Sequence, residues 1–171
     1  ALPYILSGDI PDFVDALFES VSGFSTTGAT VLTDVEALSR SCMLWRLLSQ
    51  WIGGMGVLVF MLAVMPMSGE HSMHIVRAEF PGPAVGKLVP RVRETAKILY
   101  LIYIGMTLLA FVLFACGGMS IYEALGHAFA SAGTGGFSTR NASLGEFNSL
   151  YIEVVATVFE LLFSINFYIY Y

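Results

Sequence analysis

The chain has 171 residues, of which 56% are hydrophobic and 12% are charged, and its formal net charge is −5. Soluble domains carry about 25% charged residues, so this composition predicts an integral membrane protein. The acidic balance argues against a nucleic-acid-binding role, because no basic surface is left to neutralise phosphates. Since the sequence begins with Ala1 and ends in the apolar run NFYIYY, we expect an internal piece of a longer protein.

The first predicted element is a short apolar helix over residues 12–24. A bilayer crossing takes about 20 apolar residues, so this segment predicts a re-entrant or interfacial half-helix, with Asp12 at its N-cap. The polar segment SGFSTTGAT, residues 22–30, follows it, and residues 43–66 then form the first predicted span. An outer helix that precedes the half-helix is expected before Ala1.

A basic link separates the first predicted span from the second. It covers residues 68–97 and contains five basic residues, whereas residues 1–42 are acidic. Basic loops stay on the cytoplasmic side of a membrane, so the link is predicted to be cytoplasmic and the acidic segment external. Residues 98–116 carry no charge and form the second predicted span.

The rest of the chain repeats the order of the first part. Residues 120–133 predict a second half-helix, which begins with the capping-box pattern of Ser120 and Glu123. The polar segment GTGGFST follows, and residues 150–171 form the third predicted span. The polar segments are expected on the external side, since they lie at the opposite ends of the spans from the basic link.

A shift of 108 residues superimposes the two parts. It places Asp12 on Ser120, Thr26 on Thr134, Gly28 on Gly136 and Ser41 on Ser149. One register is therefore kept across a half-helix, a Gly/Thr segment and the start of a long span, which indicates a duplication.

The Gly/Thr segments predict a cation path. Irregular backbone at membrane depth is tolerated only inside protein or along water, because lipid cannot satisfy its polar groups. Each segment follows the negative C-terminal end of a half-helix and offers carbonyl and hydroxyl oxygens, as potassium filters do. External turns remain the alternative interpretation. A phosphate-binding loop is less well supported, because GTGGFST has no lysine and follows a helix.

Several stretches together resemble the Trk/Ktr/HKT superfamily of potassium transporters, and within it the bacterial TrkH type. FESVSGFSTTGATVL is similar to the first pore loop of that family, and WRLLSQWIGGMGVLV to the inner helix that follows. RAEFPGP and KLVPRVRETAKILYLIY resemble the cytoplasmic link and the next outer helix. ALGHAFASAGTGGFSTRNASLGEF resembles the second pore loop, and FSINF the helix after it.

The resemblance implies an all-α membrane protein built of helix–pore-loop–helix units, with two of the four units of a pseudo-fourfold pore in this chain. Residues 1–67 would hold the pore helix, filter loop and inner helix of the first unit, residues 68–97 the cytoplasmic link, and residues 98–171 the second unit. Because two loops cannot surround an ion, these residues alone are not expected to conduct.

The resemblance also implies K⁺ translocation in a bacterial inner membrane, with no organic cofactor, a homodimer, and a cytosolic TrkA-type nucleotide-binding regulator. By position, it assigns the filter to two sets of residues: Thr26, Thr27 and Gly28, and Thr134, Gly135 and Gly136. Some plant relatives carry serine at the position of Gly28 and favour Na⁺, so Gly28 favours K⁺, with Na⁺ as a second possible ion.

Other residues carry open or minor predictions. Glu160, within the third span, lies either beside the ion path or in a helix contact. Arg140 is expected to anchor its loop rather than to repel cations. The side chain of Arg46 is expected to reach the membrane–water interface. The glycines of WIGGMG are expected either to allow close helix packing or to act as a hinge. An intramembrane enzyme that uses Glu160 and His127 is a less well supported alternative, because the sequence shows no further catalytic group at a matching depth. Cys42 and Cys116 are expected to be buried thiols. Asn166 is expected to form a hydrogen bond with a neighbouring helix. His71 and His74 are expected to be solvated.

Overall fold

The computed structural model describes residues 1–56 and 92–165, and the secondary structure within these ranges is entirely helical. This confirms the all-α prediction for the described part of the chain. The α-helices are α1 (Leu2–Ser7), α2 (Phe13–Phe24), α3 (Arg40–Gly54), α6 (Val92–Cys116), α7 (Ile121–Ala132) and α8 (Leu150–Ser164), and a 3₁₀ helix, η1 (Ser143–Phe147), precedes α8.

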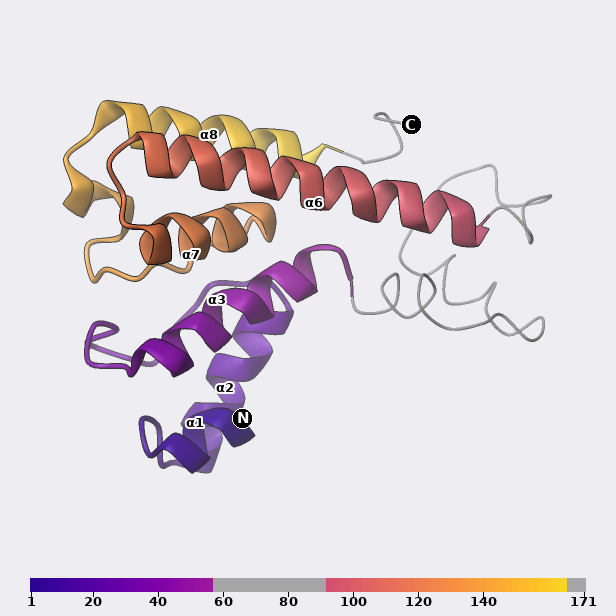
Figure 1. Ribbon diagram of the computed structural model, residues 1–171. Coiled ribbons are helices and arrows are strands. Elements are labelled where there is room, and N and C mark those ends of the chain that lie inside the picture. The colour runs from indigo at the N-terminus through magenta and orange to yellow at the C-terminus, as the bar shows by residue number, and fades with distance from the viewer. Residues whose placement is uncertain (57–91, 166–171) are drawn as a thin grey trace.

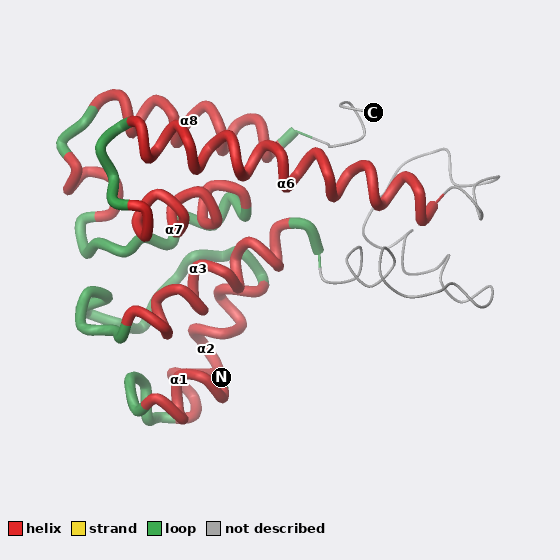
Figure 2. The backbone as a smooth tube through the Cα atoms, viewed as in Figure 1, coloured by secondary structure: helices red, strands yellow, loops and turns green. Residues whose placement is uncertain are grey.

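Helix α3 connects two halves of the molecule. It packs against α2 on one side and against α7 on the other, and α7 is covered in turn by α6 and α8. Figure 1 shows α1 to α3 in the lower part and α6 to α8 in the upper part, with α3 and α7 side by side. Figure 2 shows that the long connecting loops of both halves lie mostly at one end of the helices.

Both half-helices begin where the capping patterns predict. The side chain of Asp12 accepts hydrogen bonds from the N–H groups of Val14 and Asp15 at 2.8 and 3.1 Å. The capping box of Ser120 and Glu123 is complete, because each side chain bonds the backbone of the other residue. These bonds satisfy N–H groups that have no partner within the first turn of a helix.

The long helices differ from the predicted spans in their bounds. Helix α3 ends at Gly54, because Gly56 adopts a φ of +71°, and the predicted residues 57–66 lie outside the described residues. Helix α8 ends at Ser164 and Ile165 is extended, so the third predicted span, residues 150–171, is not helical at Ile165, and its residues 166–171 lie outside the described residues. Helix α6 begins at Val92, inside the predicted link. Residues 93–97 include the good helix formers Arg, Glu, Ala and Lys, which explains the longer helix.

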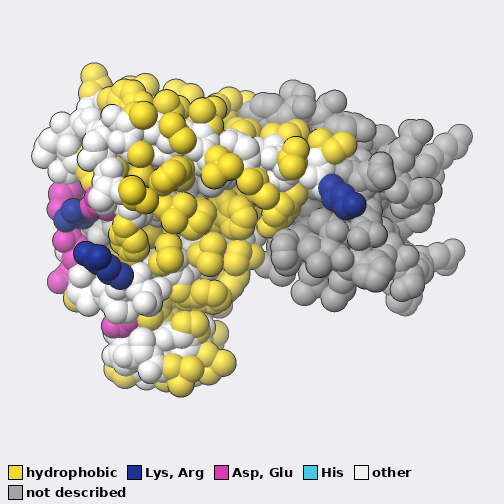
Figure 3. Space-filling view, viewed as in Figure 1, with side chains coloured by type: hydrophobic (Ala, Val, Ile, Leu, Met, Phe, Trp, Pro, Cys, Tyr) yellow, Lys and Arg dark blue, Asp and Glu magenta, His cyan; other side chains and the backbone are white. Residues whose placement is uncertain are grey.

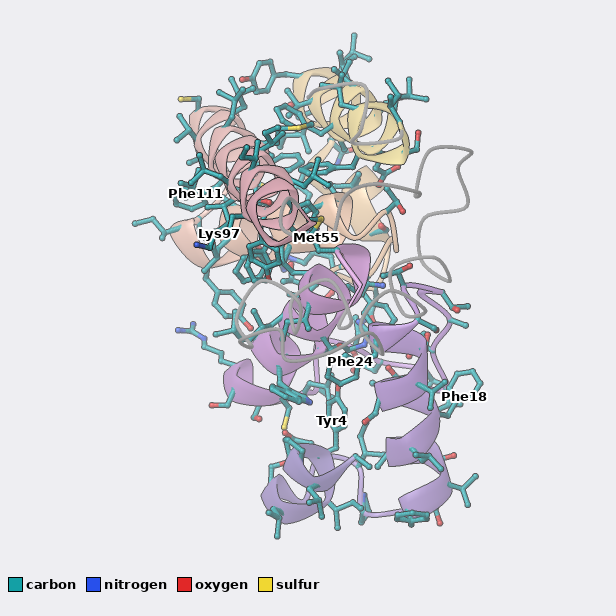
Figure 4. All side chains as sticks on the ribbon, turned by 90° about the vertical axis from the view of Figure 1, so that its right-hand side faces the viewer. Tyr4, Phe18, Phe24, Met55, Lys97 and Phe111 are labelled. Carbon is teal, nitrogen blue, oxygen red and sulfur yellow. The ribbon has the colours of Figure 1, made fainter. Side chains whose placement is uncertain are left out.

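Among the described residues, Lys97–Cys116 is the one helical stretch with the length and apolar composition to cross a membrane. Many apolar side chains of the molecule face outward, for example Phe18, which is 43% exposed and points away from the helices in Figure 4. Met55 lies between α3 and the upper helices in the same view and is buried. Outward-facing apolar side chains fit a protein with lipid or further protein around it.

Helix α1 takes the place in the first half that the end of α6 takes in the second. Tyr4 and Phe114 are both fully buried. Gly8 and Gly118 follow the two helices and have φ values of +81° and +94°. Each donates its N–H to the carbonyl group of the residue three positions earlier, at 3.1 Å. The outer helix of the first half was expected before Ala1, and the short helix α1 was not predicted from the sequence.

Candidate functional site

The two predicted filter segments lie against one another at the C-terminal ends of α2 and α7. Gly28 approaches the carbonyl group of Gly135 so closely that a Cβ atom on Gly28 would overlap its oxygen. Gly28 therefore needs to be glycine for space as well as for its φ of +74°. The structure thus brings together two segments that are more than a hundred residues apart in sequence.

The two segments share one backbone conformation. Thr26 and Thr134 have φ values of +56° and +50°, and Gly28 and Gly136 have values of +74° and +78°. The residue between them is not at positive φ in either segment. The 108-residue register that was found in the sequence therefore holds for the backbone, residue by residue.

The N–H groups of both segments turn back toward the half-helices. Thr26 donates to the carbonyl of Gly23 and Thr134 to that of Ser131, both at 3.0 Å. Within the described residues, the six carbonyl groups of 26–28 and 134–136 accept no hydrogen bond. These six backbone oxygens therefore have no donor among the described residues, and oxygen atoms of this kind are the ligands of potassium filters.

Gln50, on α3, lies between the two segments and was missed in the sequence. Its side chain is fully buried, and its Oε1 accepts the N–H of Phe137 at 3.2 Å. Its amide group lies against the Cα of Gly135, where a Cβ atom would overlap it. A glutamine in the middle of an apolar span was the available signal, because a buried amide needs hydrogen-bond partners.

Arg46 and Glu19 form a buried ion pair, which the sequence interpretation also missed. Arg46 Nε lies 2.9 Å from Glu19 Oε2, and the two side chains are 2% and 0% exposed. The prediction that Arg46 reaches the interface is therefore wrong. A charge inside a low-dielectric region needs a partner, so an acid and a base in the middle of neighbouring apolar helices were a signal for a pair.

Arg140 anchors the loop that follows the second predicted filter segment, as predicted. Its Nη2 lies 2.6 Å from Glu123 Oε1, and its Nη1 lies 3.5 Å from both Glu36 and Glu146. The hydrogen bonds to Glu123 raise the pKa of the Arg140 guanidinium. Charged side chains gather at the end of the molecule where these loops lie, and apolar side chains cover the middle (Figure 3). This end of the molecule therefore carries acids that are partly neutralised by one arginine.

Asn141 joins the loops that follow the predicted filter segments in the two halves. Its Nδ2 donates to Asp34 Oδ1 at 2.8 Å, and its Oδ1 accepts the N–H of Val35 at 2.8 Å. The hydrogen bond from Asn141 is the largest cause that lowers the pKa of Asp34. The two loops behind the filter segments are thus held by direct side-chain contacts.

Gly53 and Gly54 of WIGGMG pack closely, as one of the two interpretations predicted. A Cβ on Gly53 would overlap the carbonyl of Phe24, just before the first filter segment. A Cβ on Gly54 would lie 2.7 Å from the Cα of Gly133, just before the second. Helix α3 therefore supports both segments through backbone contacts that require glycine.

The remaining candidates have mixed outcomes. Cys42 is buried, but Cys116 is exposed, so the prediction for Cys116 is wrong. His127 is buried and bonds the carbonyl of Glu123 and the hydroxyl of Ser138. Glu160 is half-buried, and its role stays open. Among the described residues no group of three or more His, Cys, Asp or Glu side chains could hold a metal ion. His71, His74 and Asn166 lie outside the described residues.

The family model for TrkH, described as a cation transport protein, matches residues 1–171. The chain is 41% identical over 169 residues to the Trk system potassium uptake protein TrkH of Halomonas elongata, covering 98% of this chain and 35% of that protein. It is 42% identical over 170 residues to TrkH of Escherichia coli K12, with the same two coverages. The chain therefore spans about a third of the length of these relatives, which are transporters.

A solved structure is similar as well. The crystal structure of the potassium transporter TrkH from Vibrio parahaemolyticus superimposes with a TM-score of 0.75 and 38% sequence identity. The match covers 93% of this chain and 31% of that one. At this identity and coverage, the all-helical membrane fold described above is the fold of those transporters.

Proposed function

This chain belongs to the TrkH family of cation transport proteins, and we propose that residues 26–28 and 134–136 form two quarters of the selectivity filter of a potassium-translocating membrane protein. The observation that carries the proposal is the pair of equivalent segments whose six carbonyl groups have no donor among the described residues. Carbonyl oxygens in such rings replace the hydration shell of K⁺.

Backbone conformation supports this role. In each segment, positive φ values at the first and third residues flank a residue that is not at positive φ. Alternation of this kind can turn successive carbonyl groups toward the same side of the chain, where they can bind one row of ions. Both segments also follow the C-terminal ends of α2 and α7, where the helix dipole is negative and favours a cation.

The sidedness and assembly of the transporter follow from charge and from resemblance. We place residues 68–97 on the cytoplasmic side of a bacterial inner membrane, because loops rich in Lys and Arg stay in the cytoplasm. The filter segments then lie toward the outside. The proposed transporter is multi-pass, forms a homodimer, binds a TrkA-type regulator and passes K⁺, with Na⁺ as a minor ion. The molar mass of the purified full-length protein in solution, measured with and without that regulator, tests whether the protein forms a dimer and binds the regulator.

The filter assignment is tested by Gly28→Ser and Gly136→Ser in the full-length chain. Both positions have positive φ, and a side chain on Gly28 would also overlap Gly135, so each change should displace carbonyl groups. We expect slower growth of a K⁺-uptake-deficient strain and a lower K⁺/Na⁺ permeability ratio, with the larger loss for Gly28→Ser.

Gly8→Ser is the matched control for this experiment. Gly8 has a φ of +81°, close to the +78° of Gly136, and neither glycine has an atom within 4 Å of an added Cβ. The two substitutions therefore introduce similar backbone strain, but only Gly136 lies in a filter segment. Unchanged growth and selectivity in both filter variants, or an equal loss in Gly8→Ser, would contradict the filter assignment.

A further inference from the structure

We propose that Glu19 and Arg46 act as a positioning pair, which holds the two filter segments at a fixed distance and so sets the preference for K⁺ over Na⁺. This inference rests on the proposed filter function. Neither side chain is assigned a contact with the ion, so the pair would act through the loops that it touches.

Glu19 holds the first loop. Its Oε1 accepts a hydrogen bond from the N–H of Val31 at 2.8 Å and another from the hydroxyl of Thr30. These residues follow Gly28 by two and three positions. A fully buried carboxylate with these bonds fixes the path of the chain directly after the first filter segment.

Arg46 holds the second loop. Its Nη1 donates to the carbonyl of Ser138 at 3.4 Å, and its guanidinium carbon lies 3.5 Å from the centre of the Phe137 ring. Phe137 and Ser138 directly follow Gly136. Since Arg46 also bonds Glu19, one chain of contacts runs from the first loop to the second through two buried side chains.

Arginine suits this role better than lysine. The guanidinium group is planar and has several donors, so it can bond Glu19 and Ser138 while its face lies on Phe137. A single ammonium group cannot make these three contacts together. The geometry therefore depends on the shape of the arginine and not only on its charge.

The second half of the chain contains the equivalent contact without the charge. His127 stands at the repeat position of Glu19, and its Nε2 lies 2.9 Å from the hydroxyl of Ser138, which stands at the position of Thr30. Val154 stands at the position of Arg46 and is 51% exposed. A neutral pair is thus sufficient to hold a loop to its own half-helix, and the charged pair is found where two loops must be joined.

Two variants in the full-length chain separate positioning from simple charge neutralisation. Arg46→Lys keeps a cation beside Glu19 but loses the bridge to Phe137 and Ser138. The double variant Glu19→Gln with Arg46→Gln removes both charges, and its shorter side chain at residue 46 also loses the bridge. Arg40→Lys is the control, because Arg40 lies on the same helix with an exposed side chain.

We expect both test variants to lower the K⁺/Na⁺ permeability ratio about tenfold or more, which is the size of the loss of one charge-assisted hydrogen bond. The ratio is taken from reversal potentials and does not depend on the number of molecules in the membrane. Abundance should stay near that of the unchanged chain, since neither variant leaves a buried charge unpaired. Arg40→Lys should leave the ratio unchanged.

An unchanged ratio in Arg46→Lys, or in the double variant, overturns the positioning role. If the pair only neutralised buried charge, each of these variants would replace it without loss, because neither leaves an unpaired charge. Gly28→Ser serves as the reference in the same measurements. If Gly28→Ser lowers the ratio while the pair variants do not, the filter assignment stands and this inference fails. If Gly28→Ser and Gly136→Ser also have no effect, the proposed function fails first.

Discussion

Thr26 and Thr134 hold β-branched side chains at positive φ, which is an uncommon conformation for such residues. A residue of this kind costs about 1–3 kcal/mol and persists only where its surroundings determine it. Here the surroundings are hydrogen bonds to the half-helices and, for Thr26, contact with Gly53. The same strain at two equivalent positions suggests that carbonyl direction, rather than local stability, determines the backbone of both segments.

At the same scale, the bond between Asp34 and Asn141 predicts a pH dependence of the external loops. The folded pKa of Asp34 is lowered, first by the bond from Asn141, so its contribution to stability is present above the unfolded pKa of about 3.9. It should be lost as the pH falls through the folded pKa. Hydrogen exchange of the amide of Val35, measured above and below this range, should show the loop opening in acid.

Asn141→Ala is the control for that measurement, because it removes the donor and also the acceptor for the Val35 amide. The protection factor of the amide, which is its exchange rate corrected for the intrinsic rate at each pH, should then be low at all pH values. If the protection factor in the unchanged chain does not depend on pH, Asp34 does not contribute to the closure of the loop.

At the scale of elements, α3 is the support of the site. It contributes Arg46 and Gln50 to the space behind the filter segments, and it contacts the chain before both segments with Gly53 and Gly54. Trp51, from the same helix, donates its indole N–H to Thr107 of α6 at 3.1 Å. One helix of the first half therefore sets the position of both loops relative to the second half.

Gly53→Ala tests this support. The added Cβ would overlap the carbonyl oxygen of Phe24 and lie 2.9 Å from its carbon, and this backbone cannot move without moving the first filter segment. We expect a loss of about 1–3 kcal/mol in stability, as for other overpacked sites, and slower K⁺ uptake. Thermal unfolding in detergent and uptake into cells are the measurements.

Gly105→Ala, in α6, is the matched helical control, because nothing lies within 4 Å of its added Cβ. It should leave stability the same or raise it, since alanine favours a helix over glycine. Equal losses in the two variants would mean that the contact of Gly53 with Phe24 does not limit the fold.

At the scale of the whole molecule, the two halves leave one side of the proposed filter segments uncovered. Thr27, Thr134 and Gly136 are exposed in this chain, while Phe137 behind them is buried. A K⁺ ion in a filter is surrounded by oxygen atoms on all sides. Two segments supply only part of that shell.

We therefore expect the 171-residue polypeptide, reconstituted alone in liposomes, to give no K⁺-selective flux, whereas the full-length transporter gives one. A fluorescent flux assay with a K⁺ gradient measures the difference. K⁺-selective flux through the short polypeptide would show that two segments, or two copies of them, are sufficient.

The sequence by itself determined the helical membrane class, both half-helices with their caps, the 108-residue repeat and the glycines of the two segments. These features depend on composition, periodicity and local hydrogen bonds, which neighbouring residues decide. Only the tertiary structure decided that Arg46 pairs with Glu19, that Gln50 lies between the loops, and that Gly53 and Gly54 contact the chain before each segment. Such contacts join distant segments, and a buried charge or amide takes whichever partner the fold brings to it.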